Sequence, residues 1–494
     1  MKKTIVGIIS LLLVVMLSVG LFAACNPTTD DPAGETESLL GVTDTEIWVG
    51  NTAGVTGALE TIGAPFNLGI EAAFAAYNAQ GGFNGKSVRL KNLDDGGDST
   101  KSLSLMEQLI FEDEVFAIVG NFGSYAVNVN LDTLKEEKVP MIYAAAGNDS
   151  LYNANADTAE EKVIFPVQPL NVTEGNSLIA RAFAAAAMPD ANSATGYALT
   201  GGLGATKVGV IANNNEASKS LLQGIREEAN RLPEAKKNAI VYQEVAGSDF
   251  SAAANALVAA QCDLIIVTTI GADYMAALTA LSNANYVGNV LTSYNNASAA
   301  VFNDATTKLI TAQGAEILSK MVIYTQGWID ISSTTYVYNP EGGSALLNEY
   351  KALDTLLGTS LYANGVPGFN EEYWGIAENI YNYAIAAGKG AATAFAMSYD
   401  SYALAGYIAG DLFCQGLKEL QAAGKDLTRA NYVEIMETKA FHIALGDSIN
   451  YQGGARKGVE AFGLSMMYNY NGAATSVSTG TGLASIETLR GLIA

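Results

Sequence analysis

The feature that most constrains the fold of this chain is a regular alternation of apolar runs and amphipathic stretches that begins near residue 45. Residues 46–53 (EIWVGNTA) have the pattern of a buried strand, and residues 65–80 have that of a helix ended by the glycines at 81–82. Further strand patterns, separated by helical ones, are residues 87–94, 115–121 and 139–145. This alternation predicts βαβ units and therefore a parallel sheet with helices on both faces.

The alternation pauses at residues 163–176 and then restarts, which indicates two units of similar layout. The strand patterns of the second unit are residues 206–213, 238–246, 262–269 and 289–294. No long flexible linker separates the units. The predicted fold class is therefore α/β, with two doubly wound parallel-sheet lobes.

Polar turns follow the predicted strands of both units. They are NTAGVTGA, GNFGSYA and AAAGND in the first unit, and ANNNEAS, TTIGAD and TSYNNAS in the second. All six are rich in Gly, Ser, Thr and Asn, and none contains Lys, Arg or His. Ligands of open parallel sheets bind beyond the carboxyl ends of the strands. The turns therefore predict a cleft for a small, polar and net-neutral molecule.

The turn GNFGSYA has the chemistry of a carboxylate site. A helix is expected to begin at Ser124, with that serine as its N-cap and the N–H groups of Tyr125 and Ala126 free. Such a helix start can hold a carboxylate without a basic residue, and Gly120 and Gly123 would let the backbone approach a ligand closely. A plain capped turn is the alternative to a ligand contact.

The first 24 residues have the pattern of an export signal, because Lys2 and Lys3 precede an unbroken apolar run at residues 5–22. The run ends in LFAAC, which resembles a bacterial lipoprotein signal with Cys25 as the lipidated residue. An ordinary signal peptide and a transmembrane anchor stay open. Residues 25–44 would then be the lipidated cysteine and a flexible tether. The predicted location is the extracytoplasmic face of the cell membrane.

The formal charge of −23, from 50 acidic and 27 basic residues, disfavours nucleic acid and anionic membrane surfaces as partners. The chain has one histidine, His442, and no Gly-x-Ser-x-Gly elbow that would carry a nucleophile. Clusters of His or Cys that zinc needs are absent. A binding protein without cofactor or metal is therefore favoured over an enzyme.

Two further motifs have simple interpretations. The turn LDDGGDS at residues 93–99 has three carboxylates, for which a solvated turn is favoured over a calcium site because the EF-hand spacing is not met. Cys262 lies in a strand pattern and Cys414 in a helical one. Free buried thiols are expected, although a disulfide stays open outside the cytoplasm.

Residues 41–90 (GVTDTEIWVGNTAGVTGALE to KSVRL) and residues 115–148 (VFAIVGNFGSYAVNVNLDTLKEEKVPMIYAAAGN) resemble type I periplasmic binding proteins. The most similar group is the branched-chain amino-acid (Leu/Ile/Val) binding family of ABC importers. The resemblance covers roughly residues 41–325 and returns near 398–470.

The resemblance implies two lobes joined by three crossing hinge segments. The crossings would lie near residues 165–169, 325–329 and 461–464. Lobe 1 would comprise residues 45–165 and 328–461, with an insertion at about 331–396, and lobe 2 residues 166–327 and 462–494. Capping the cleft, contacting a permease and decorating one lobe stay open as roles of the insertion.

The resemblance also implies that Ser124 and the backbone of Ala145, Ala146 and Gly147 hold the carboxylate and ammonium of an amino acid. Gly147 stands where the family has a threonine, and Tyr294 stands where leucine-type proteins have an acidic residue. Glu216 or Asp273 could supply the missing negative charge. The candidate ligand-binding residues are Thr56, Phe122, Ser124, Tyr125, Ala145, Ala146, Gly147, Asn215, Glu216, Thr269 and Tyr294. Phe122, Tyr294 and Trp328 could form apolar walls.

These features predict a monomeric, lipid-anchored solute-binding protein that delivers an amino acid, or a similar small carboxylate or amide, to an ABC permease. One alternative is a sensor that presents its ligand to a membrane receptor. A less favoured alternative is an amide hydrolase, since a nucleophile elbow is missing.

Overall fold

The computed structural model describes most of the chain after the tether. The described residues are 40–186, 201–304, 306–307, 309–470, 472–479 and 482–493. The predicted export signal, the lipidation site Cys25 and most of the tether lie outside them. No helix among the residues that are described is long and apolar enough to cross a membrane.

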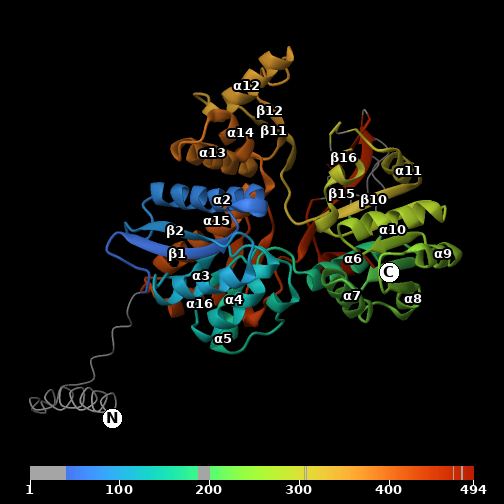
Figure 1. Ribbon diagram of the computed structural model, residues 1–494, viewed down its shortest axis with the longest axis horizontal. Coiled ribbons are helices and arrows are strands. Elements are labelled where there is room, and N and C mark those ends of the chain that lie inside the picture. Colours follow the sequence, from blue (N-terminus) through green and yellow to red (C-terminus); the bar gives the residue numbers. More distant parts are fainter. Residues whose placement is uncertain are drawn as a thin grey trace, which may run out of the picture. The chain divides into compact units, whose positions relative to one another are not determined.

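The first sheet has five parallel strands in the order β2-β1-β3-β4-β5. They are β1 (Glu46–Ala53), β2 (Ser87–Asp94), β3 (Ile118–Val119), β4 (Met141–Ile142) and β5 (Ile164–Phe165). The connecting helices are α2 (Glu60–Ala79), α3 (Ser99–Phe111), α4 (Ser124–Glu136) and the short α5 (Ala159–Lys162). This is the predicted βαβ arrangement, and helices lie beside both faces of the strands (Figure 1).

The second sheet has the order β16-β15-β10-β9-β8-β6-β7, with β17 paired to β15. Its parallel strands are β6 (Val208–Asn213), β7 (Ile240–Val245), β8 (Leu264–Val267), β9 (Gly288–Thr292) and β10 (Met321–Gly327). The antiparallel strands are β15 (Ala461–Tyr470), β16 (Ala473–Ser478) and β17 (Ala484–Ser485). Its helices are α6 (Asn171–Phe183), α7 (Glu216–Ala229), α8 (Glu234–Lys237), α9 (Ser251–Ala259), α10 (Ala272–Asn283), α11 (Ala312–Lys320) and α17 (Ile486–Gly491). The predicted α/β class is confirmed, with two large sheets built on parallel strands; the described residues also form two small two-stranded sheets.

The chain passes three times between the elements of the two sheets. It runs from β5 to α6 through residues 166–170, and from β10 to β11 through residues 328–331. The third passage leads from the 3-10 turn η5 (Gln452–Gly454) to β15 through residues 455–460. Each of these connections is short and joins elements that contribute to different buried clusters.

The residues after the second passage form an additional group of helices. The hairpin of β11 (Ser332–Tyr338) and β12 (Val366–Phe369) encloses α12 (Ala345–Leu357), and α13 (Glu371–Ala386) and α14 (Ala391–Ser398) follow. Trp374 is buried against Tyr338, with ring centroids 4.2 Å apart. These residues continue the core of the first sheet, because Trp374 belongs to the same buried cluster as Phe66 of α2.

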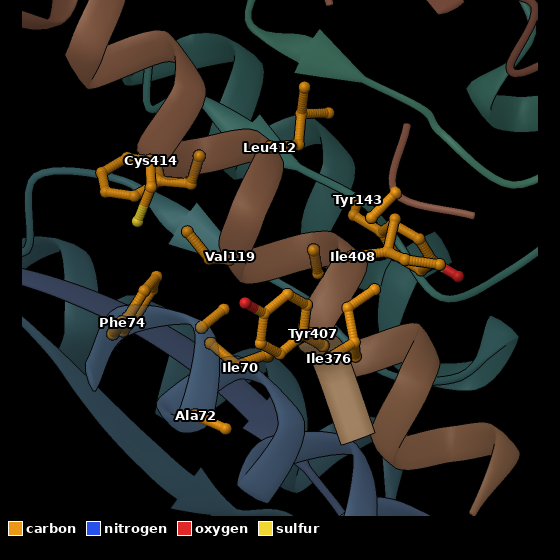
Figure 2. Close-up of a cluster of buried hydrophobic side chains, with 14 of the residues drawn as sticks. Ile70, Ala72, Phe74, Val119, Tyr143, Ile376, Tyr407, Ile408, Leu412 and Cys414 are labelled. Atoms are coloured by element: carbon orange, nitrogen blue, oxygen red, sulfur yellow. The ribbon is translucent and has the colours of Figure 1, made fainter. Parts of the chain in front are cut away.

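The contact between α2 and α15 (Ser401–Ala422) depends on glycines. A Cβ atom at Gly69 would lie 2.0 Å from the carbonyl oxygen of Ala403, and one at Gly406 would lie 1.8 Å from that of Phe66. The absence of these Cβ atoms lets the two backbones meet. Side chains of both helices, among them Ile70 and Ile408, form a buried cluster there with β3 of the sheet (Figure 2).

The remaining elements are α16 (Arg429–Thr438) and the hairpin of β13 (Ala440–His442) and β14 (Ser448–Asn450). His442 lies on the surface, where its Nε2 is 2.6 Å from Glu372 Oε1. Cys262 and Cys414 are free and buried, as expected. The predicted start of the first helix at Pro65 was wrong. The helix begins at Glu60 with Pro65 inside it, directly after the 3-10 turn η1 (Gly57–Leu59).

Candidate functional site

Carboxylates join the loops that follow β1, β2 and β3. Asp94 accepts hydrogen bonds from the N–H of Val55 (3.0 Å) and from the hydroxyl of Thr56. Asp95 accepts one from the hydroxyl of Tyr125 at 2.8 Å. The expectation of a solvated turn was wrong for Asp95, which is 1% exposed. Asp94 and Asp95 therefore fix the positions of Thr56 and Tyr125. The described residues contain no group of three His, Cys, Asp or Glu able to hold a metal ion.

The turn before α4 places a glycine, and not Ser124, at the N-cap. Gly123 has φ +91° and ψ 142°, and Ser124 is the first helical residue. The N-cap prediction was therefore wrong, because only glycine takes this backbone conformation without strain. The prediction of a free Ala126 N–H was also wrong, because Ala126 donates to the carbonyl of Gly123 at 3.1 Å. Among the described residues, the N–H groups of Ser124 and Tyr125 have no hydrogen-bond acceptor.

Ser124 connects α4 to the loop after β4. Its hydroxyl donates to Asn148 Oδ1 at 2.7 Å, and the amide of Asn148 donates to Asn128 Oδ1 at 2.8 Å. Ser124 is exposed at the carboxyl end of the first sheet, where the segments that follow β1, β2, β3 and β4 form what we call the first rim. A backbone donor at the start of a 13-residue helix is suited to an anion.

The three candidate residues after β4 differ in whether their backbone N–H groups are free to bind a ligand. Ala145 donates its N–H to Asn121 at 2.9 Å and accepts from Gly123 at 3.2 Å, so both of its backbone groups are engaged. Ala146 donates to Ala144 at 2.9 Å. The N–H of Gly147 has no acceptor within the described parts of the chain. Gly147 is thus the member of this trio with a free backbone donor.

Phe122 lies in a row of aromatic side chains. It is 8% exposed, and its ring centroid is 5.1 Å from that of Phe66 and 6.4 Å from that of Tyr402. Phe66 continues the row to Tyr143, and Tyr143 to Trp328. Tyr402, which is 41% exposed, and the partly buried Trp328 end the row. Phe122 is therefore mainly a core residue that supports an aromatic wall.

Tyr294 brings the second sheet to the first rim. A Cβ atom at Gly147 would lie 3.4 Å from the hydroxyl of Tyr294 and 3.2 Å from Asn171 Oδ1. The same hydroxyl donates to the carbonyl of Pro169, in the first passage, at 3.3 Å. Gly147 therefore lies against both the Tyr294 hydroxyl and the Asn171 side chain, with Asn171 the nearer of the two.

The other candidate residues of the second sheet differ in how far they are exposed to solvent. Asn215 caps α7 by accepting from Ala217 at 3.0 Å, and Glu216 is exposed in the first turn. Thr269 is fully buried, and its hydroxyl is among the buried polar groups without a partner in the described structure. Asp273 accepts from Asn213 at 2.7 Å. Glu216 is thus better placed than Thr269 to meet a solute.

Sequence reasoning missed Asp149, which follows the turn AAAGN. Its Oδ2 accepts from the hydroxyl of Ser220 on α7, and its Oδ1 is buried without a partner in the described structure. Burial raises the pKa of the Asp149 carboxyl, the Ser220 hydrogen bond opposes this, and the charges of Glu216 and Glu227 raise it further. Negative charge therefore gathers where α7 meets the first rim.

Glu174 on α6 was also missed, because an acidic residue in a first helical turn is usually an exposed dipole partner. Here it is fully buried and accepts from the hydroxyl of Ser293 (2.6 Å) and the N–H of Tyr294 (2.7 Å). No pattern in the sequence shows that this helix is buried on all sides.

The structure thus brings several candidates together and leaves others apart. Ser124 and Gly147 lie on loops joined through Asn148, and Gly147 adjoins Tyr294. Glu216 acts on Asp149 electrostatically. None of the candidates lines either of two cavities of about 330 and 360 Å³. The larger one is lined by Tyr152, Thr173, Asn176, Arg231, Lys457, Glu460, Ser485, Ile486, Glu487 and Arg490.

Comparison with known proteins gives similarities of sequence. The family model described as "Periplasmic binding protein" matches residues 46–352. The Leu/Ile/Val-binding protein homolog 2 of Brucella abortus (strain 2308) is 32% identical over 108 residues, which are 22% of this chain and 29% of that protein. The match thus spans less than a third of this curated relative.

Solved structures show similarity of fold. A substrate binding protein of an ABC transporter from Aeropyrum pernix gives a TM-score of 0.55 at 16% identity, with 91% of this chain and 99% of that chain covered. A fatty acid ABC transporter substrate-binding protein from Thermomonospora curvata gives 0.51 at 16% identity, covering 91% and 95%. A solute binding protein from R. palustris in complex with benzoate gives 0.50 at 16% identity, covering 89% and 96%.

Proposed function

The chain belongs to the periplasmic binding protein family, and from this premise we propose that it is the extracytoplasmic solute-binding protein of an ABC importer. Its ligand is an amino acid or a similar small carboxylate. It is held between the first rim and a second rim, formed by the segments that follow β6, β8 and β9 of the second sheet. The hinge formed by the three passages closes the rims on the ligand and excludes water, which strengthens the few polar contacts.

The observation that carries this proposal is the set of free backbone donors at the first rim. The N–H groups of Ser124, Tyr125 and Gly147 have no acceptor among the described residues. They belong to two loops that the Ser124–Asn148 hydrogen bond holds together. Several N–H groups and a helix dipole at one rim suit a carboxylate. Two of the solved relatives are named for a fatty acid and benzoate, which are carboxylates.

The negative charge around Asp149 favours a ligand that also carries an ammonium group. None of the influences on the Asp149 carboxyl comes from a lysine or arginine. An ammonium beside Asp149 would stabilise its carboxylate in the ionised form and would also be attracted by the exposed Glu216. A zwitterionic amino acid would thus place its carboxylate at the free N–H groups and its ammonium beside Asp149. This arrangement does not need the second-lobe acidic residue of leucine-type proteins.

A thermal-shift screen of the protein from residue 26 onward tests the proposal. Amino acids, small carboxylates and amides are added singly, and a tight ligand raises the melting temperature by mass action. The variants are Ser124→Pro, which removes one free N–H together with the hydroxyl that bonds Asn148, Ser124→Ala, which removes that hydroxyl alone, and Lys135→Ala at the far end of α4. We expect Ser124→Pro to weaken the response to the active compound more than Ser124→Ala does, and Lys135→Ala to leave it unchanged. No shift with any carboxylate would contradict the proposed ligand class.

The membrane anchor and the permease belong to the same proposal. Lipidation of Cys25 would keep the binding protein near its permease, with the tether up to residue 44 allowing movement. We expect Cys25→Ser to release the exported protein into the medium, as measured by fractionation. Membrane retention of Cys25→Ser would argue instead for an uncleaved apolar anchor.

A further inference from the structure

Glu174 connects the start of α6, which follows the first passage, to the loop that carries Tyr294. It lies in the first turn of α6, with 0% of its surface exposed. Its two oxygens accept separate hydrogen bonds, from Ser293 Oγ at 2.6 Å and from the N–H of Tyr294 at 2.7 Å. One buried side chain thus holds two consecutive residues of the loop after β9.

Ser293 in turn organises the rest of that loop. Its Oγ accepts from the N–H of Asn295 at 3.1 Å, and its carbonyl accepts from the N–H of Asn296 at 3.0 Å. The amide of Asn296 then donates to the carbonyl of Thr269 at 2.9 Å. Holding Ser293 therefore fixes the whole turn of residues 293–296, and with it the direction of the Tyr294 side chain toward Gly147.

Within the described part of the chain, no lysine, arginine or histidine influences the Glu174 carboxyl. The ionisable group that faces it from the loop is the phenol of Tyr294, whose pKa is raised by burial and then by the charge of Glu174. On α6 itself, Arg181 directs its guanidinium to the carbonyls of Gly201 and Phe462. Burial raises the pKa of Glu174 to about 7, although the hydrogen bonds from Ser293 and Tyr294 oppose the rise.

We propose that Glu174 is a positioning residue of the solute site, which places Tyr294 by holding residues 293–296 on α6 and holds them more firmly when its carboxyl is protonated. The functional part of this inference rests on the proposed solute-binding role of Tyr294. The structural part, the proton-dependent hold on the loop, does not depend on it.

The sign follows from the exposure of Glu174 in the two states of the loop. With the loop in place the carboxyl is buried, and its pKa is about 7. When the loop opens, water reaches the carboxyl and its pKa falls toward the ordinary glutamate value. The closed state therefore binds the proton more tightly, so acid favours closure. A protonated Glu174 can still accept from Tyr294 N–H through its carbonyl oxygen and from the Ser293 hydroxyl through its other oxygen.

Hydrogen exchange of the ligand-free protein tests the inference. Protection of the peptide that spans residues 290–298 is measured between pH 5 and pH 8 and corrected for intrinsic exchange. We expect protection in the wild type to fall on the order of 100-fold across this range. Glu174→Gln has nearly the same shape but no titration, so its protection should not change with pH. Ser293→Ala should keep the profile with a midpoint at higher pH, because one hydrogen bond to the ionised form is lost.

A wild-type profile that is flat, or one that persists in Glu174→Gln, would overturn the inference. If Glu174→Gln fails to fold, the wild-type profile and its displacement in Ser293→Ala still decide. Because no solute is present, failure here is distinct from failure of the ligand screen. Once a compound from that screen binds, weaker binding by wild type at pH 8 than at pH 5, with no such difference in Glu174→Gln, would connect the loop to the solute site.

Discussion

Replacing Gly123 with alanine tests the carboxylate site most directly. The residue has φ +91°, and a Cβ atom there would lie 2.5 Å from Tyr125 Cε1 and 2.9 Å from its Cδ1. Two costs follow. An alanine in this backbone region costs about 1–3 kcal/mol. The Tyr125 ring must also move, which breaks its hydrogen bond to the Asp95 carboxylate, at about 1.5–3 kcal/mol. The total is about 2.5–6 kcal/mol.

Gly81→Ala separates the two costs, because Gly81 also has a positive φ (+104°) but nothing within 4 Å of its would-be Cβ atom. Urea unfolding should show a larger loss of unfolding free energy for Gly123→Ala than for Gly81→Ala. The difference is the cost of moving the Tyr125 ring and breaking its hydrogen bond. In a Tyr125→Phe background the hydrogen bond is already absent, so Gly123→Ala should cost less there than in the wild type.

The same variants report on binding. If α4 begins with free N–H groups aimed at a carboxylate, Gly123→Ala should lower the affinity for the compound found by thermal shift, measured by calorimetry, more than Gly81→Ala does. Equal stability losses in the two glycine variants, together with unchanged affinity, would refute the account of this turn.

Three further predictions address the charge, the packing and the pH dependence. Asp149→Asn should weaken binding of an ammonium-bearing ligand by about tenfold, equivalent to about 1.4 kcal/mol, and leave a simple carboxylate unaffected, as calorimetry with both would show. Gly406→Ala should destabilise the protein strongly in urea, since its Cβ would be 1.8 Å from Phe66 O, whereas Gly375→Ala, on the open side of α13, should be neutral or stabilising by up to about 1 kcal/mol. Glu174 has a folded pKa of about 7, above its unfolded value, so its contribution to the free energy of unfolding is fully present below about pH 4.5 and is lost as the pH rises through 7. Relative to Glu174→Gln, the wild type should therefore lose about 3 kcal/mol of unfolding free energy over that range, measured by urea unfolding. An opposite slope would contradict the assigned burial.

Much of the fold was predictable from local pattern. The strand 46–53 and the start of α4 at Ser124 are where the alternation placed them, because a buried strand needs continuous apolar residues and a helix needs its own period. The start of α2 was not predictable in this way. A proline is typical of the first turn of a helix, but here the 3-10 turn η1 and the first turn of α2 from Glu60 precede Pro65.

The sequence by itself determined the α/β class, the polar turns after the strands and the small residues beside α4, because each depends on neighbours along the chain. The tertiary structure decided the electrostatics of the site. The burial of Glu174, the approach of Ser220 to Asp149 and the placement of Tyr294 over Gly147 each join residues more than 70 positions apart. A carboxylate in water and one buried among such partners have different pKa values and different uses, and the chain order alone does not distinguish them.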